Sequence, residues 1–320
     1  MPRLIFIPQY PAKLRYQEWW YTEIPKQFRN LGWDVLVVDG NKDTDDRDES
    51  LFSPITKSIK FELEQLKQFT DLKVYPDDVI FLADISFPGF FANSFVYKKT
   101  DNIYAFCHAT AKNRYDLFES FRDVKYTIEK SQANLFKTIF VGSQYHKDKL
   151  GWQNTKVVYL PMPPFSGKEL EKEYDVVSVS RPTKQKVDLE LEKFLENELD
   201  IKIVRPTNLN SWDDYYEFLA KSKVLFISAV EDTFGYQIID AILNKCIPIV
   251  RDCCAYKEII SEKYMYSSKT DAADLVYDAL HYFDLVPEIL IKDEMKHWYE
   301  NISDIMKSNL QRSFGVTVLL

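Results

Sequence analysis

Short apolar runs alternate with amphipathic segments along most of the chain. The first run, Arg3 to Pro8, has the length of a buried strand, and the segment from Tyr16 to Leu31 has helical spacing and is closed by Gly32. Asp34 to Asp39 is a second short apolar run. The chain therefore opens with a strand, a helix and a strand, which is the rhythm of parallel α/β domains.

The same rhythm continues through both halves of the chain. In the first half it predicts a helix over residues 55–69 and strands over residues 78–83, 103–107, 137–142 and 157–160. In the second half it predicts strands over residues 174–180, 201–204, 224–228 and 247–250, with helices between them and a helical pattern over residues 271–311. The expected fold is α/β, with two Rossmann-like domains that face a central cleft.

A stiff segment, Pro161-Met162-Pro163-Pro164, lies between the two halves and is typical of a domain boundary. We predict an N-terminal domain of residues 1–164, a C-terminal domain of residues 165–295, and a helical segment of residues 296–320 that packs back on the N-terminal domain. In domains of this kind ligands bind at the carboxyl ends of the strands, so the loops that follow strands are where chemistry is expected.

Composition narrows the class of protein. The 320 residues are 46% hydrophobic and 28% charged, and no apolar run is long enough to span a bilayer. The N-terminus lacks the features of a secretory signal, so a cytoplasmic protein without a transmembrane segment is expected. The four cysteines have neither disulfide nor zinc-site spacing, and the net charge of −8 argues against a basic coat for nucleic acid.

The most informative stretch follows the predicted strand at 224–228. It reads Glu231-Asp232-Thr233-Phe234-Gly235-Tyr236, and Asp240 follows Asp232 after seven intervening residues. Gly235 lets the backbone come close to a ligand, and a helix that begins near Phe234 offers unpaired N–H groups to a diphosphate. The alternative for Asp240 is a place on a polar strip that faces water.

This stretch resembles the retaining nucleotide-sugar glycosyltransferases related to glycogen and sucrose synthases, which have the two-domain GT-B fold. Their signature is a carboxylate, Phe-Gly, and a second carboxylate after seven residues; Asp232 and Asp240 have that spacing, and Glu231 is the alternative for the first role. The resemblance implies that Asp240 holds the ribose hydroxyls of the donor. It covers residues 176–260 well and the first half loosely.

Cations and a further carboxylate fit the same resemblance. Arg181 and Lys186 have the spacing of the family's Arg and Lys, which implies that they stabilise the leaving diphosphate; Lys184 is an equal alternative for the Lys, and Val187 stands where the family has Gly. Glu258 matches a family Glu that contacts the donor, although the glycines before it are absent and a simple helix-start Glu is an equal alternative.

In the first half, His108 follows the strand at 103–107, where the family often has a His that faces the donor sugar; a structural histidine is the alternative. Ser143 follows the strand at 137–142, and a capping role at the next helix is expected at least as strongly. The string Asp43-Thr44-Asp45 matches the metal-binding DxD of other glycosyltransferases, but it stands in an acidic run typical of a solvated loop.

These residues lead to one functional hypothesis with two alternatives. The chain is expected to be a metal-independent, retaining glycosyltransferase without a cofactor, which moves a sugar from a nucleotide-sugar, in particular a UDP-sugar, to a hydroxyl of a soluble glycan. The alternatives are a bacteriophage DNA glycosyltransferase acting on 5-hydroxymethylated bases, and a silent sugar-binding module. The residues assigned to catalysis are His108, Arg181, Lys186 and Asp232, and those assigned to donor binding are Glu231, Thr233, Phe234, Gly235, Tyr236, Asp240 and Glu258.

Overall fold

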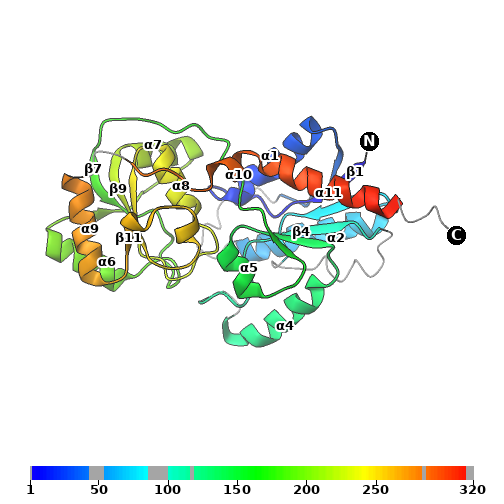
Figure 1. Ribbon diagram of the computed structural model, residues 1–320, viewed down its shortest axis with the longest axis horizontal. Coiled ribbons are helices and arrows are strands. Elements are labelled where there is room, and N and C mark those ends of the chain that lie inside the picture. The colour runs from blue at the N-terminus through cyan, green and yellow to red at the C-terminus, as the bar shows by residue number, and fades with distance from the viewer. Residues whose placement is uncertain (1, 43–53, 86–99, 116–118, 283–285, 315–320) are drawn as a thin grey trace.

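Two parallel β-sheets, one in each half of the chain, form the framework of the molecule (Figure 1). The computed structural model describes residues 2–42, 54–85, 100–115, 119–282 and 286–314. Among these residues no strand of one sheet pairs with a strand of the other. The expected α/β fold with two Rossmann-like domains is confirmed.

The first sheet takes its strands from residues 3–157. All pairs are parallel, and every residue of its two central strands is buried, which explains why these strands read as continuous apolar runs. In sheet order the strands are β2 (Asp34–Val37), β1 (Arg3–Ile7), β3 (Val79–Leu82), β4 (Ile103–Cys107), β5 (Thr138–Val141) and β6 (Thr155–Val157).

The second sheet takes its strands from residues 174–266 and is also parallel. In sheet order the strands are β11 (Met265–Tyr266), β10 (Ile247–Arg251), β9 (Ser222–Ile227), β7 (Tyr174–Val177) and β8 (Ile203–Val204). In each sheet the strand order reverses once: the second strand in the chain lies on one side of the first, and all later strands lie on its other side. The loops after β1 and β3, and those after β7 and β9, therefore lie at the switch points where α/β folds bind ligands.

Helices cover both faces of the first sheet. Leu4 and Phe6 of β1 share a core with side chains of α1 and α11, whereas Ile5 and Ile7 share a second core with side chains of α2, α4 and α5. The helices are α1 (Tyr16–Asn30), α2 (Pro54–Asp71), α4 (Arg122–Ala133), α5 (Gln144–Leu150), α6 (Leu189–Leu199), α7 (Trp212–Ala220), α8 (Tyr236–Leu243), α9 (Lys269–His281), α10 (Lys292–Lys296) and α11 (Trp298–Phe314).

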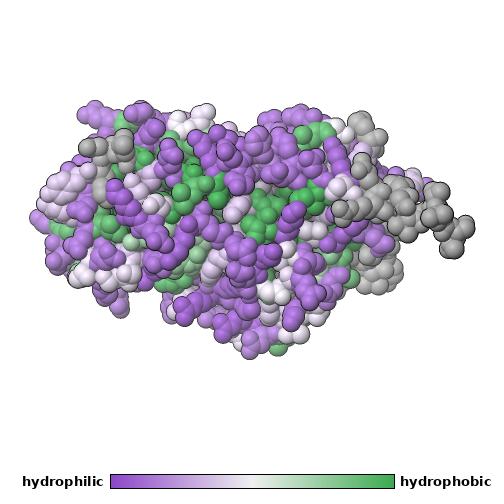
Figure 2. All heavy atoms as spheres, viewed as in Figure 1, coloured by the Kyte–Doolittle hydropathy of each residue, from purple (hydrophilic) through white to green (hydrophobic). Residues whose placement is uncertain are grey.

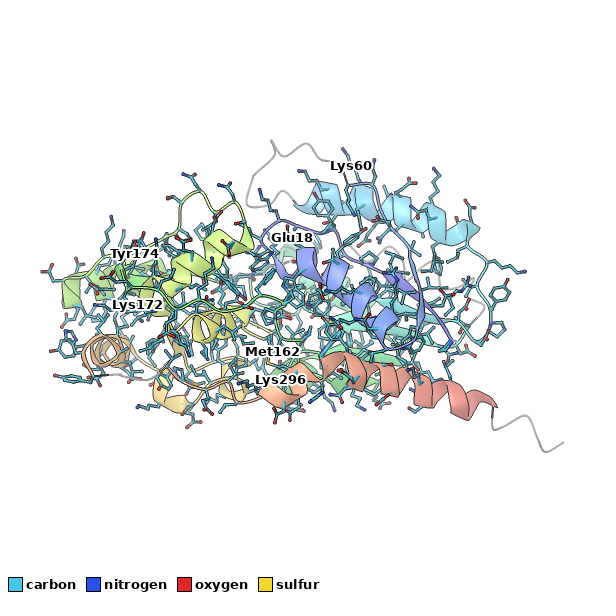
Figure 3. All side chains as sticks on the ribbon, turned by 90° about the horizontal axis from the view of Figure 1, so that it is seen from above. Glu18, Lys60, Met162, Lys172, Tyr174 and Lys296 are labelled. Carbon is cyan, nitrogen blue, oxygen red and sulfur yellow. The ribbon has the colours of Figure 1, made fainter. Side chains whose placement is uncertain are left out.

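The last two helices carry the chain from the second sheet back to the first (Figure 1). The amide of Met162 donates to the carbonyl of Met295, and Met162 and Lys296 are neighbours in Figure 3. Farther on, Ser303 of α11 accepts a hydrogen bond from the Trp33 indole at 2.9 Å. Helix α11 thus packs beside α1 on the first domain.

Several elements differ from the prediction. The strand expected over residues 157–160 is β6, which ends at Val157, and Tyr159 has a left-handed φ of 57° that is incompatible with a continuing strand. The helix expected near Phe234 begins at Tyr236, and β11 was not predicted because two residues give no periodic signal. The helical pattern after residue 271 divides into α9, α10 and α11, with Pro287 between the first two. None of the described helices has the length and apolar composition needed to cross a membrane.

Candidate active site

A cleft of about 700 Å³ lies between the two domains. Its walls come from the segments that follow β1 and β4 in the first domain and β7 and β9 in the second, with α1 and α8 beside them. On the face seen in Figure 2 the surface is mostly hydrophilic, and apolar groups gather toward the middle of the molecule, where the domains meet. Of the residues assigned to catalysis or donor binding, Glu258 alone does not line this cleft, and Lys184, the alternative to Lys186, does not line it either.

The loop between β9 and α8 brings the backbone close to the cleft. Gly235 precedes α8 with a φ of 118°, and a Cβ at this position would lie 2.9 Å from the ring of Tyr256. Both facts require glycine here. Phe234 is buried beside it. The N-terminus of α8 lies at the cleft, and the unpaired amides of a helix N-terminus favour an anion.

Two neighbours of Gly235 also hold the domains together. The Thr233 hydroxyl donates to the carbonyl of His108 at 2.6 Å, and the Tyr236 hydroxyl donates to the carbonyl of Pro161 at 3.1 Å. Ser143 donates to the carbonyl of Thr233 and accepts from the amide of His146, so the expected capping role of Ser143 at α5 is confirmed.

Asp232 and Lys186 form an ion pair in the cleft. The Lys186 ammonium lies 2.8 Å from the Asp232 carboxylate, which also accepts a hydrogen bond from the Tyr256 hydroxyl at 3.3 Å. Burial alone would raise the pKa of Asp232, but the charge and hydrogen bond of Lys186 outweigh it and the pKa is lowered. The carboxylate is ionised, and it fixes the position of the ammonium. Arg181 lines the cleft from the same loop as Lys186.

Asp240 lies within α8 and is buried, at 4% exposure, rather than on a strip that faces water. The hydroxyls of Tyr216 and Tyr215 donate to its carboxylate at 2.7 and 3.3 Å. Burial raises the pKa of Asp240 to about 7, although both tyrosine hydrogen bonds oppose the rise. Sequence reasoning missed these two tyrosines because they stand on α7, and no local pattern relates them to α8.

His108 lies at the carboxyl end of β4 among aromatic rings. Its ring centre is 4.5 Å from those of Tyr16 and Phe106, and its Nε2 is 3.1 Å from the carbonyl oxygen of Ala83. Burial lowers the pKa of His108 to about 3, so the ring is neutral at physiological pH. With the Nε2 proton assigned to the bond with Ala83, Nδ1 is a hydrogen-bond acceptor.

Solved structures with the same architecture cover the whole chain. Sucrose-phosphate synthase from Thermosynechococcus elongatus matches 98% of this chain and 98% of its own with a TM-score of 0.62 at 12% identity. The lipopolysaccharide outer core galactosyltransferase WaaB matches 96% of this chain and 99% of its own with a TM-score of 0.61 at 13% identity. The chain has the GT-B fold. At these identities the likeness establishes the fold and not the reaction.

A third GT-B structure is that of S. aureus TarM, solved as a mutant with fondaparinux, α-GlcNAc-glycerol and UDP. It matches 80% of this chain with a TM-score of 0.52 at 15% identity, and the chain spans 59% of the length of TarM. No family model matches the sequence, and no curated protein matches it either.

Two carboxylates of the C-terminal GT-B domain bind the N-terminal domain. Glu231 lies 2.6 Å from the Lys149 ammonium and accepts from the Tyr145 hydroxyl at 3.2 Å, so its carboxylate is engaged in the domain contact as well as lining the cleft. Glu258 accepts from the amides of Gln144 and Tyr145 at the start of α5. Glu258 therefore contacts the start of α5 across the domain interface and is not among the residues that line the cleft, and the donor contact expected of it stays a prediction.

The remaining predictions concern cysteines and metals. All four cysteines are free; Cys107 and Cys246 are buried, and Cys253 and Cys254 are half-buried. In the part of the chain that the structure describes, no group of three or more His, Cys, Asp or Glu side chains is arranged to hold a metal ion. The string Asp43-Thr44-Asp45 lies outside the described residues.

Proposed function

We propose that the protein is a retaining glycosyltransferase that moves a sugar from a UDP-sugar to a hydroxyl of a soluble glycan in the cytoplasm, without a metal or cofactor. The observation that carries this proposal is the cleft between two GT-B domains, which is lined by Arg181, Lys186 and the glycine turn before α8. Cations together with the N-terminal amides of a helix suit a diphosphate. The presence of UDP in the TarM complex supports a uridine donor.

In this proposal Arg181 and Lys186 act on the leaving group. Breaking the bond between the sugar and the diphosphate places new negative charge on the departing oxygen, and fixed cations stabilise that charge more in the transition state than in the bound donor. Asp232 is the positioning partner of Lys186, because the 2.8 Å ion pair restricts where the ammonium lies.

The other residues hold the donor. Asp240 is placed to accept hydrogen bonds from the ribose hydroxyls, and the buried tyrosines behind it fix the direction of its carboxylate. His108, neutral and lining the cleft, accepts a hydrogen bond from a sugar hydroxyl through Nδ1. The loop residues Thr233, Phe234, Gly235 and Tyr236 shape the wall next to the diphosphate.

Retention follows from the family resemblance. The acceptor hydroxyl attacks on the face from which the diphosphate leaves, and the leaving phosphate takes the acceptor's proton, so no protein nucleophile is needed. The cleft residues supply the charge and the geometry for this single-face reaction, and burial between the domains excludes water that would hydrolyse the donor.

Thermal unfolding with UDP-, GDP-, ADP- and TDP-sugars tests the proposal, since a ligand that binds only the folded state raises the melting temperature. We expect UDP-sugars to raise it in the wild type. Asp240→Ala should weaken this donor binding, whereas Arg181→Ala should mainly lower turnover. Lys223→Ala, which breaks an exposed ion pair with Asp175 away from the cleft, is the control. Absence of any nucleotide-sugar response in the wild type would refute the proposed function.

A further inference from the structure

Two guanidinium groups from different domains line the cleft, and the charge of Asp232, which is paired with Lys186, also acts on Arg181. Arg15 stands between β1 and α1 in the first domain, and Arg181 follows β7 in the second. Within the described residues, neither side chain makes an ion pair or a hydrogen bond. Two other cations at this domain junction are paired, Lys186 with Asp232 and Lys149 with Glu231.

Arg15 is half-buried at the cleft, whereas Arg181 is exposed there, and two like charges so placed repel each other. Burial lowers the pKa of Arg15 to about 10, and repulsion from Arg181 lowers it further in the same direction. Two guanidiniums that repel each other are both stabilised when an anion lies between them, and their planar forks match the oxygens of a phosphate. An oxyanion bound in the space that both side chains line would therefore be stabilised by both guanidiniums.

The turn that carries Arg15 is anchored from both domains. Leu14 has a left-handed φ of 53°, and its amide donates to the Glu18 carboxylate at 2.8 Å. The same carboxylate oxygen accepts from the Trp212 indole of α7 at 3.0 Å. Figure 3 places Glu18 at the end of α1 nearest the second domain. Glu18 thus fixes the backbone next to Arg15 relative to the domain that carries Arg181.

We propose that Arg15 and Arg181 together bind the leaving diphosphate, one guanidinium from each domain. This inference rests on the proposed function and extends it, because it assigns the first domain a direct part in holding the leaving group. The donor then relieves the repulsion between the two domains at the moment it binds.

Isothermal titration calorimetry with UDP and UMP tests the assignment. Arg15→Gln should weaken UDP binding roughly 10- to 100-fold, since a hydrogen bond between charged groups is lost, and should weaken UMP binding less because UMP lacks the second phosphate. Arg15→Lys should restore part of the affinity. The matched control is Lys26→Gln on α1, the helix that follows Arg15; Lys26 is an exposed lysine paired with Glu23, and this variant should bind UDP like the wild type.

A second measurement separates ligand binding from a structural role. The melting temperature of unliganded Arg15→Gln should equal or exceed that of the wild type, because the substitution removes an unmatched charge, while the shift produced by UDP should shrink. Unchanged UDP affinity in Arg15→Gln with a raised KM for the acceptor would assign Arg15 to an acceptor anion and overturn the proposal. If the wild type binds no nucleotide, the proposed function fails while the arginine pair can still be tested with inorganic pyrophosphate. An equal rise in melting temperature with pyrophosphate in the wild type and in Arg15→Gln would show that Arg15 does not bind the anion and would overturn the proposal.

Discussion

Asp240 is a single carboxyl group whose charge state is set by opposing contributions. Its burial inside α8 favours the neutral acid, whereas the hydroxyls of Tyr215 and Tyr216 favour the carboxylate. The result is a pKa of about 7, far above the usual range for aspartate. If Asp240 accepts hydrogen bonds from two ribose hydroxyls, the donor binds the ionised form more tightly than the neutral form.

Donor affinity is therefore expected to depend on pH. Between pH 5 and 7 the affinity for a UDP-sugar should rise, by at most about tenfold per pH unit, and it should level off above pH 7 where Asp240 is ionised. The phosphates of a UDP-sugar do not titrate in this range. Calorimetry from pH 5 to 8 checks the profile, and Asp240→Asn should give a weak affinity that does not change with pH. A flat wild-type profile would contradict this role of Asp240.

Helix α8 depends on the conformation of one residue before it. Gly235 has a φ of 118°, which residues other than glycine rarely adopt, and the ring of Tyr256 occupies the space that a side chain would need. The helix entry, the backbone amides that face the cleft and the register of Asp240 all follow from this turn. A change at residue 235 should therefore affect stability and donor binding together.

Gly235→Ala and Gly151→Ala form a matched pair. Gly151 caps α5 with a φ of 64° and has open space where a Cβ would lie. Each alanine should cost about 1–2 kcal/mol of unfolding free energy for left-handed backbone, and Gly235→Ala should cost more because the new Cβ meets Tyr256. Urea unfolding measures both. Only Gly235→Ala should also lose affinity for the UDP-sugar, and equal donor affinity in the two variants would contradict the assignment of the turn to the donor.

The two domains are joined by hydrogen bonds and ion pairs that lie around the cleft. Glu231 binds Lys149 and Tyr145 across the junction, and it also accepts from the amide of Arg114 at 3.3 Å. Both charged partners are well buried, with side-chain exposures of 15% for Lys149 and 3% for Glu231. The relative placement of the domains, and hence the shape of the cleft, depends on this contact.

Glu231→Ala is expected to loosen the junction. It leaves the Lys149 charge without its partner, which typically costs about 3–5 kcal/mol when such a pair is buried. Urea unfolding measures the loss, and hydrogen exchange at the Arg114 amide should become faster. Asp175→Ala, which breaks the exposed pair with Lys223, should change stability by less than about 1 kcal/mol. Unchanged exchange at Arg114 in Glu231→Ala would show that Glu231 does not hold the domains together.

The sequence by itself determined those helices, strands and site residues that depend on a short stretch of neighbouring residues. The strand predicted at 103–107 is β4 with the same limits, because a strand buried on both faces must be apolar throughout. The family signature after β9 likewise pointed to Asp232, Gly235 and Asp240, and the rule that ligands bind where strands end, together with the same resemblance, pointed to Arg181 and His108. All five line the cleft.

Only the tertiary structure decided which distant side chains meet. Nothing in the sequence pairs Asp240 with the tyrosines of α7, joins Glu231 to Lys149, or places Glu258 at the start of α5. No motif in the sequence marks Arg15, which the structure places in the same cleft as Arg181. Periodicity reports which face of an element is buried, whereas the partner on that face depends on how two separately folded sheets pack together.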